Sequence, residues 1–405
     1  MNFGLIGEKL GHSYSRIIHE KLSEYDYELY SLEKDELDSF MKGRGFSGLN
    51  VTIPYKQAVI PYCDILTPLA ERLGAVNTIY FDEKGQMVGA NTDYYGFEKA
   101  AADAGIDFQG KKVLVLGRGG ASKAVLAVSE DGGAEEVVLT GRDCDLSSHR
   151  DAEIVVNATP VGMYPNNGKS LIDLNDFPNV TGVIDLVYNP LCTGLIQQAE
   201  ELSIPCANGL SMLVSQAMKS AELFTGREAF CEKSSEILKE LKSDIINIVL
   251  IGMPGCGKTT IGKELAKLTG KTFIDTDQEI EKSEFSSIPE LFRTFGEKYF
   301  RDVESRIAEK TGKKSGCIVA TGGGIILRKE NMDAFSQNGI IVYIDRNVEN
   351  LATDGRPLSK DFAALREMRK KRMPLYLKYS DIQMESSGNP ADTAENICSA
   401  VNRLL

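Results

Sequence analysis

NIVLIGMPGCGKTT, from Asn247 to Thr260, is the stretch that decides the fold of the second part of this 405-residue chain. Its apolar first half predicts a buried strand, and its second half is the glycine pattern GxxxxGKT, which leads into a helix-forming segment. Such a turn wraps backbone N–H groups around phosphate oxygens, so the stretch predicts a nucleotide-binding loop. Because more than half of the chain precedes this loop, a complete domain should stand before it.

The same pattern predicts roles within the loop. Lys258 adds a point charge and is expected to be catalytic, while the Thr259 hydroxyl suits a magnesium ion. Cys256 is interpreted as a small filler residue rather than a catalytic thiol, because the loop needs compact side chains. Nucleotide contacts are expected from Gly252, Gly255, Gly257, Thr259 and Thr260.

The composition is that of a globular protein, 42% hydrophobic and 26% charged, with about two to four domains. Up to residue 245 the chain has 22 basic and 36 acidic residues, which disfavours nucleic acid as a partner of this part. No apolar run reaches membrane-spanning length and no basic, apolar leader follows Met1, so a cytoplasmic protein without membrane contact is expected. The eight cysteines form no C-x-x-C pair and only three histidines occur, which argues against a zinc site or a disulfide scaffold.

Residues 1–100 alternate short apolar strands with helical patterns, which predicts an α/β domain. At residues 113–128, VLVLGRGGASKAVLAV, a strand meets a glycine turn and an alanine-rich helix. This arrangement can lay a pyrophosphate on a helix N-terminus, although a tight turn without a ligand has the same pattern. Further strands predict a doubly wound, Rossmann-like dinucleotide domain over residues 101–208. A helix over 209–226 and a charged helical linker over 231–245, free of Gly and Pro, lead to the last domain, residues 246–405.

Three segments before the glycine turn are rich in hydroxyl, amide and charged side chains. Groups that both donate and accept hydrogen bonds suit a polyhydroxylated substrate, and a lysine with an aspartate could act at the reacting carbon. Taken one by one, the same residue types are also common caps and turn formers of loops. The residues are Ser13, Ser15, Asn50, Thr52, Lys56, Asn77, Asn91 and Asp93.

Together these segments resemble shikimate dehydrogenase over residues 1–230. The family's motifs stand in order: HSxS from His12, NVTxPxK from Asn50, AxNT from Ala75, NTDxxG from Asn91, GxGG from Gly117, NATPxGM from Asn157, YNP from Tyr188 and MLVxQA from Met212. The resemblance implies that Lys56 and Asp93 handle the proton while a hydride passes between a nicotinamide and the ring carbonyl carbon. It also implies that the helix over 209–226 completes a substrate domain formed by residues 1–100. The implied contacts are Ser13, Ser15, Thr52, Asn77, Tyr188 and Gln216 for the substrate, and Gly117, Gly119, Gly120, Ala121 and Arg142 for the cofactor.

The segment around Arg142 departs from the family's pattern. Arg142 could stack on adenine and pair with a 2′-phosphate. Asp143 and Asp145 would instead repel that phosphate and could accept from a free ribose hydroxyl. NADP is therefore the cofactor expected from the resemblance, and NAD is the alternative. With NAD as cofactor, the first half could also be a quinate dehydrogenase.

The second part carries further candidate groups after its loop. Asp275 and Asp277 stand two residues apart at the end of a predicted strand, where carboxylates can serve a magnesium ion and a substrate hydroxyl. Arg301 and Glu304, one helical turn apart, taken alone predict a surface ion pair. The run RKKR, Arg369 to Arg372, taken alone predicts a solvated helix face, and the three glycines of residues 322–324 allow close approach of a ligand.

With the phosphate loop, these segments resemble shikimate kinase over residues 246–405, in the order FxDxDxxIE, GExxFRxxE, GGG, RPL and RxPLY. The resemblance implies a parallel α/β domain of the P-loop NTPase type, similar to nucleoside monophosphate kinases. It implies that Asp277 orients the 3-hydroxyl of shikimate or accepts its proton, and that Lys258 and Arg356 stabilise the transferred phosphoryl group. The lid before Arg356 is short, which departs from the family. The implied substrate contacts are Arg301, Gly323 and Arg372, and the implied magnesium site is Thr259 with, through water, Asp275.

The sequence therefore predicts a bifunctional enzyme of the shikimate pathway, which serves aromatic amino acid biosynthesis. It would reduce 3-dehydroshikimate to shikimate with NADPH and then phosphorylate shikimate with ATP and Mg²⁺. The alternatives are a quinate or shikimate dehydrogenase that prefers NAD in the first half, or one half that is non-catalytic and regulatory. The expected partners are small molecules, and the oligomeric state is left open.

Overall fold

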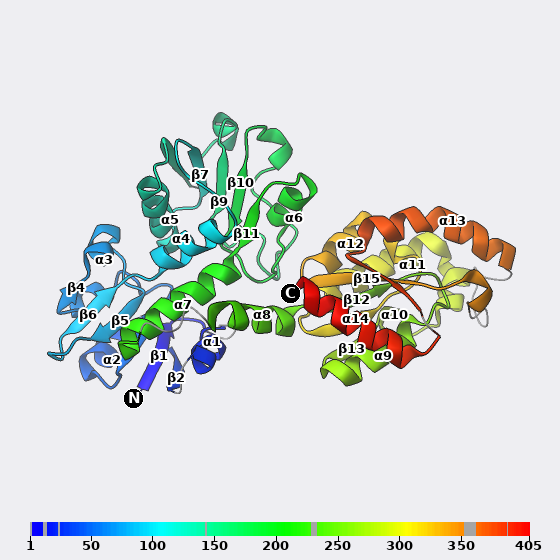
Figure 1. Cartoon of the computed structure of the whole chain (residues 1–405), viewed down its shortest axis with the longest axis horizontal. Helices are drawn as coiled ribbons and strands as arrows, with labels where there is room; N and C mark the ends of the chain where they lie inside the picture. Colours follow the sequence, from blue (N-terminus) through cyan, green and yellow to red (C-terminus); the bar gives the residue numbers. More distant parts are fainter. Residues whose placement is uncertain are drawn as a thin grey trace. The chain divides into compact units, whose positions relative to one another are not determined.

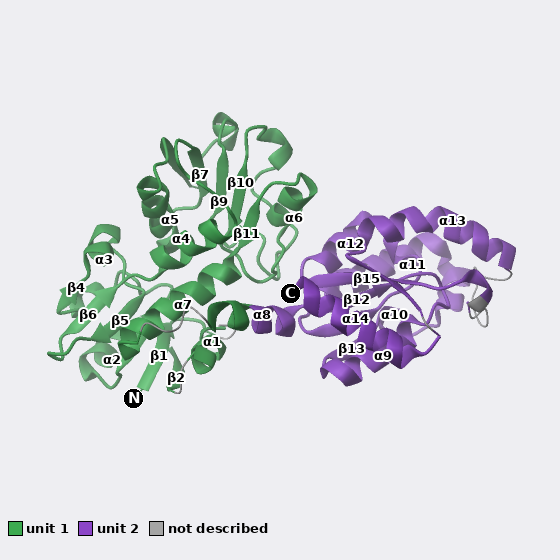
Figure 2. Cartoon of the chain, in the orientation of Figure 1, with its two compact units in different colours: residues 1–238 green, residues 239–405 purple. Residues whose placement is uncertain are grey.

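The computed structural model describes residues 2–10, 14–22, 25–141, 144–227, 233–351, 362–386 and 388–405. The chain divides into two compact units, residues 1–238 and 239–405 (Figure 2). Both units combine helices with largely parallel sheets, which confirms the predicted α/β fold class. Within the described ranges, no helix has both the length and the apolar character needed to cross a membrane.

The first sheet of unit 1 has six strands in the order β2-β1-β3-β5-β6-β4. Only β5 runs antiparallel to its two neighbours, β3 and β6. Its strands are β1 (Asn2–Gly7), β2 (Asp26–Ser31), β3 (Gly48–Val51), β4 (Ile65–Leu66), β5 (Thr78–Phe81) and β6 (Met87–Ala90). The helices of this region are α1 (Ser15–Leu22), α2 (Leu37–Gly43), α3 (Pro68–Leu73) and α4 (Asp93–Asp103). The short elements β4 and α3 were not predicted, because neither is long enough to show an apolar period.

Helix α7 (Gly209–Thr225) comes late in unit 1 but packs against α1 and β5 of the first sheet's layer, and also against α4 (Figure 1). Gly96 of α4 lies so close to α7 that an added Cβ would stand 2.7 Å from the carbonyl oxygen of Met212. The amide of Asn50, on β3, donates to Ser220 Oγ on α7 over 2.7 Å. The helix is therefore part of the first sheet's layer, although the whole second sheet separates the two in the chain.

The second sheet has five parallel strands in the order β11-β10-β9-β7-β8. Val113 and Val115 pack in one apolar cluster and Leu114 and Leu116 in another, so both faces of β7 are covered, as a parallel sheet requires. Because β8 and β9 lie on opposite sides of β7, the strand order reverses at the carboxyl end of β7, where α5 begins. The elements are β7 (Lys112–Leu116), β8 (Glu136–Thr140), β9 (Ile154–Asn157), β10 (Gly182–Asp185), β11 (Cys206–Asn208), α5 (Gly120–Asp131) and α6 (Gly194–Glu201).

Helix α8 (Ser234–Ile245) occupies most of the predicted linker, and the division between the two units falls within it. The sheet of unit 2 has five parallel strands in the order β13-β14-β12-β15-β16, with the strand that precedes the phosphate loop at its centre. The strands are β12 (Asn247–Ile251), β13 (Thr272–Asp275), β14 (Cys317–Ala320), β15 (Gly339–Asp345) and β16 (Ile382–Glu385). The helices are α9 (Lys258–Thr269), α10 (Thr276–Glu284), α11 (Ile288–Gly312), α12 (Lys329–Ser336), α13 (Phe362–Tyr379) and α14 (Pro390–Leu404).

Candidate functional sites

A cavity of about 400 Å³ in unit 1 brings together the polar segments of the first sheet, the start of α5 and helix α7. Its wall contains nearly all of the predicted substrate and proton-handling residues of this unit. Ser13, which the sequence also assigned to the substrate, lies outside the described residues. The predicted residues that line the cavity are Ser15, Asn50, Thr52, Lys56, Asn77, Asp93, Ala121, Tyr188 and Gln216.

Lys56 and Asp93 form an ion pair in this wall. Lys56 Nζ donates to Asp93 Oδ2 over 2.5 Å, and the two side chains are 16% and 9% exposed. Asn77 Nδ2 donates to the second carboxylate oxygen, Oδ1, over 2.9 Å. Asp93 is the first residue of α4, where the helix dipole favours a carboxylate. An ammonium held in this way can stabilise a developing alkoxide and supply a proton to it.

Buried hydroxyls behind the cavity fix the amides that line it. Asn77 Oδ1 accepts from the backbone N–H of Thr92 over 2.7 Å. Asn50 Nδ2 donates to Ser220 Oγ over 2.7 Å and to Thr78 Oγ1 over 3.1 Å. A satisfied buried network holds its members in one arrangement, so these amides are oriented before a substrate arrives. The sequence did not single out Ser220, because only the packing of α7 brings its hydroxyl to this network.

The glycine turn after β7 has the shape of a pyrophosphate cradle. Gly117 has φ of 116°, and a Cβ there would stand 2.9 Å from Thr159 Cγ2. A Cβ on Gly119 would meet nothing within 4 Å, and one on Gly120 would meet Lys56 Cδ at 3.6 Å, so the N-terminus of α5 is open to a ligand. Ala121, in the first turn of α5, also lines the substrate cavity. The turn therefore leaves room for a ligand at the N-terminus of α5, beside the side chain of Lys56.

The segment after β8 is described only in part. Arg142 and Asp143 lie outside the described residues. Asp145 instead caps the short 3-10 helix Leu146–His149, because its Oδ1 accepts from the backbone N–H and the hydroxyl of Ser147 over 3.0 and 2.7 Å. These hydrogen bonds lower the pKa of Asp145. Its carboxylate is thus engaged locally, which weakens the argument for NAD that rested on it.

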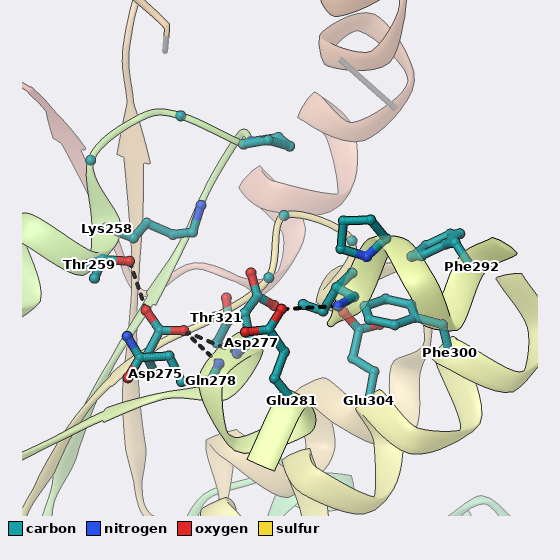
Figure 3. Close-up of a pocket in the computed structure, with 18 of the residues that line it drawn as sticks. Lys258, Thr259, Asp275, Asp277, Gln278, Glu281, Phe292, Phe300, Glu304 and Thr321 are labelled. Atoms are coloured by element: carbon teal, nitrogen blue, oxygen red, sulfur yellow. Dashed lines mark hydrogen bonds between the residues drawn. The ribbon is translucent and has the colours of Figure 1, made fainter. Parts of the chain in front are cut away.

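A cavity of about 620 Å³ in unit 2 extends from the phosphate loop to helix α11. Figure 3 shows Lys258 and Thr259 at one end and Phe292 and Phe300 at the other. Gly252 opens the loop with φ of 150° without lining the cavity, and Arg356 lies outside the described residues. The predicted residues that line it are Gly255, Gly257, Lys258, Thr259, Thr260, Asp275, Asp277, Arg301, Gly323 and Arg372.

At the loop end, Asp275 links the phosphate loop to α10 (Figure 3). Its Oδ2 accepts from Thr259 Oγ1 over 2.8 Å, and its Oδ1 accepts from the backbone N–H of Asp277 over 3.1 Å. Asp277 therefore lies in the first turn of α10 and not, as predicted, at the end of the strand. Lys258 Nζ donates to the carbonyl oxygens of Gly252 and Met253 over 2.9 and 3.0 Å.

The donor set at this end fits a magnesium ion. Among the described residues, no group of three or more His, Cys, Asp or Glu side chains could hold a metal by itself. Magnesium keeps several waters and takes further oxygens from phosphates, so a hydroxyl and a carboxylate are the contribution it needs from the protein. Cys256 is fully buried, as its interpretation as a filler residue requires.

At the other end, Arg301 and Glu304 of α11 are buried, with 8% and 1% exposed. The surface pair predicted from spacing alone is therefore wrong. Arg301 Nη1 donates to Glu304 Oε2 over 2.6 Å, and burial raises the pKa of Glu304 against the opposing effect of Arg301. Arg372 is also only 8% exposed and donates to the carbonyl oxygen of Gly323 over 3.0 Å, so the predicted solvated face does not include it.

The three glycines after β14 lie in close contact with other parts of the unit. A Cβ on Gly322 would stand 2.7 Å from Asp277 Oδ1, and one on Gly323 would stand 2.7 Å from Pro254 Cδ. A Cβ on Gly324 would overlap the guanidinium of Arg301. The run thus lets a carboxylate, the phosphate loop and an arginine converge on one strand end.

Comparison with known proteins identifies relatives of both units. The family model of the shikimate dehydrogenase substrate binding domain matches residues 5–79, and that of shikimate kinase matches residues 254–402. Shikimate dehydrogenase (NADP(+)) of Clostridium perfringens (strain 13 / Type A) is 37% identical over 266 residues, covering 59% of this chain and 98% of that protein.

Solved structures resemble the first unit. The crystal structure of shikimate dehydrogenase 1 from Peptoclostridium difficile matches with a TM-score of 0.55 and 38% identity, over 60% of this chain and 97% of that one. Quinate dehydrogenase from Corynebacterium glutamicum, in complex with NAD, matches with a TM-score of 0.53 and 28% identity, over 59% of this chain and 97% of that one.

Proposed function

This chain belongs to the shikimate dehydrogenase family by its first unit and carries a shikimate kinase domain in its second, and from this we propose the reaction sequence that it performs. It reduces 3-dehydroshikimate to shikimate with NADPH, and it then phosphorylates the 3-hydroxyl of shikimate with ATP. The observation that carries the proposal is that in each unit a cavity lined by lysine and aspartate side chains lies beside a glycine turn that leads into a helix. We assign residues 1–100 with α7 to the first substrate, residues 101–208 to the dinucleotide and residues 246–405 to the kinase.

In unit 1 the bound NADPH supplies the hydride. Lys56 stabilises the negative charge that develops on the carbonyl oxygen and donates a proton to it, while Asp93 holds the ammonium in position. Asn77 and Gln216 lie in the same wall, where amides can both donate to and accept from ring hydroxyls. Ser15, Thr52 and Tyr188 are the remaining described hydroxyl groups of this site.

In unit 2, ATP with Mg²⁺ supplies the phosphoryl group. When ATP binds, the Lys258 ammonium gives up its hydrogen bonds to two backbone carbonyl oxygens and donates to phosphate oxygens instead. Thr259 and Asp275 are the protein groups that we assign to the magnesium ion. Asp277 orients the attacking hydroxyl and accepts its proton. Arg301 and Arg372 are planar, buried cations that line the cavity, which suits the carboxylate of the substrate.

The experiment that tests the proposal supplies 3-dehydroshikimate, NADPH and ATP with magnesium to the full chain and follows both shikimate and its 3-phosphate. Transient shikimate followed by the phosphate ester is the expected result. Formation of shikimate without the phosphate ester would contradict the proposed kinase activity. If NADPH were not consumed, the proposed dehydrogenase activity would be wrong.

The likeness to an NAD-bound quinate dehydrogenase favours one second candidate for unit 1. In that case the unit would oxidise quinate with NAD faster than shikimate with NADP. Initial rates for the four combinations of the two substrates and the two cofactors separate these candidates.

A further inference from the structure

Arg118, the middle residue of the glycine turn GRGG, places its side chain across the end of β8. Its Nε and Nη2 donate to the carbonyl oxygen of Leu139 over 3.4 and 3.2 Å. A Cβ on Gly141 would stand 3.7 Å from its Cζ. The exposed guanidinium is therefore held at the strand end by contacts with its backbone.

In doubly wound dinucleotide-binding sheets, the end of this strand lies next to the adenosine part of the cofactor. The adenosine ribose lies beside the glycine turn, and its 2′ position faces the end of the strand that follows the turn's helix, where enzymes that use NAD offer a carboxylate. Here that strand is β8, and it ends in Thr140 followed by Gly141. Thr140 is buried and donates its hydroxyl to the carbonyl oxygen of Val115 over 3.1 Å. Among the described residues, the end of β8 therefore carries the Arg118 guanidinium from the glycine turn, close to the position where NAD-dependent enzymes have a carboxylate.

We propose that Arg118 is a specificity-determining residue that binds the 2′-phosphate of NADP. The inference rests on the proposed dehydrogenase function of unit 1 and names a determinant that lies in the glycine turn itself. A guanidinium is a planar fork that matches phosphate oxygens, and it keeps its charge at every physiological pH. The chain up to residue 245 has 36 acidic against 22 basic residues, so a fixed cation at this point offsets the repulsion that a doubly charged phosphate would meet.

The test measures binding rather than turnover, by titrating the full chain with NADPH and with NADH and following nicotinamide fluorescence. Arg118→Ala is expected to weaken NADPH binding about tenfold or more, the size of one charge-assisted contact, and to change NADH binding less than about twofold. Arg118→Lys keeps the positive charge but lacks the planar fork of the guanidinium. Its affinity for NADPH should therefore lie between that of the unchanged chain and that of Arg118→Ala. Salt should weaken NADPH binding more steeply in the unchanged chain than in Arg118→Ala.

Arg150→Ala is the matched control, because it removes the same charge from the connection between β8 and β9. Arg150 lies after the short 3-10 helix and pairs with Asp176 over 3.4 Å, and its replacement should leave NADPH binding within about twofold. Equal weakening of NADPH and NADH by Arg118→Ala, no weakening of either, or a larger effect of Arg150→Ala would each overturn the inference. A chain that binds neither dinucleotide and oxidises neither shikimate nor quinate would instead overturn the dehydrogenase proposal itself.

Discussion

Arg301 occupies the space that a side chain on Gly324 would need. The glycine has φ of −102°, which an alanine adopts without strain, and the obstacle is the movable end of an arginine. We expect Gly324→Ala to fold and to displace the guanidinium, raising the kinase KM for shikimate about tenfold, as the loss of one charged hydrogen bond would. Dehydrogenase kcat/KM of the same preparation is the internal control. An unchanged kinase KM would show that Arg301 does not bind the substrate.

Replacing Lys56 should separate the two activities. Lys56→Met removes the ammonium that faces the reacting carbonyl, so we expect kcat for shikimate oxidation to fall about 100-fold or more, with kinase activity unchanged. Lys99→Ala is the control, because it removes an exposed lysine that pairs with Asp103 one turn away in α4. If Lys56→Met oxidised shikimate at the rate of the Lys99 variant, the assigned proton donor would be wrong.

The reciprocal change is Asp277→Asn, which keeps the shape of the side chain and removes its charge. Kinase kcat should drop about 100-fold or more because the hydroxyl loses its proton acceptor, whereas shikimate oxidation should continue. Glu279→Gln serves as control, since this residue lies on the same helix and pairs with Lys282 over 2.8 Å at the surface. Comparable losses in both variants would indicate an effect on α10 and not on the chemistry.

Asp185 predicts a pH dependence of stability. Burial raises its pKa from 3.8 to about 6, although Thr193, Val187 and Asn157 donate hydrogen bonds that favour the charged form. Between about pH 4 and 6 the folded chain holds a proton that the unfolded chain has lost, so this group's contribution to stability declines as pH rises through 6.

The variant Asp185→Asn cannot titrate and keeps the shape of the side chain. Relative to the unchanged chain, its free energy of unfolding should rise between pH 4.5 and 7 by about 2 kcal/mol, because the pKa of about 6 lies about 1.5 units above the lower pH and each unit corresponds to about 1.4 kcal/mol. Urea unfolding of both proteins across this range measures the difference directly. A difference that stays constant with pH would mean that Asp185 is already ionised at the lower end.

The glycine turns and their flanking strands could be predicted from sequence because their physics is local. A strand, a turn with positive φ and a helix N-terminus are all encoded within about fifteen residues. Arg301 and Glu304 show where local reasoning fails, since their spacing is equally typical of a surface pair and only the contacts with residues 322–324 bury them. Ser220 and Arg118 could not be identified for the same reason. The hydroxyl of Ser220 reaches Asn50 only through the packing of α7, and Arg118 stands at an unconstrained position of its motif.

The late position of α7 also bears on how the chain is made. On a ribosome the six strands of the first sheet emerge well before the helix that packs on them, because the entire second sheet is translated in between. Until then Asn50 of β3 and Thr78 of β5 lack the hydroxyl of Ser220, and Gly48 of β3 lacks the ring of Phe224. The face of the first sheet that α7 covers therefore stays exposed until α7 has been synthesised. Chaperones would be most useful to the nascent chain during this interval. The kinase unit is synthesised last, after that face has been closed.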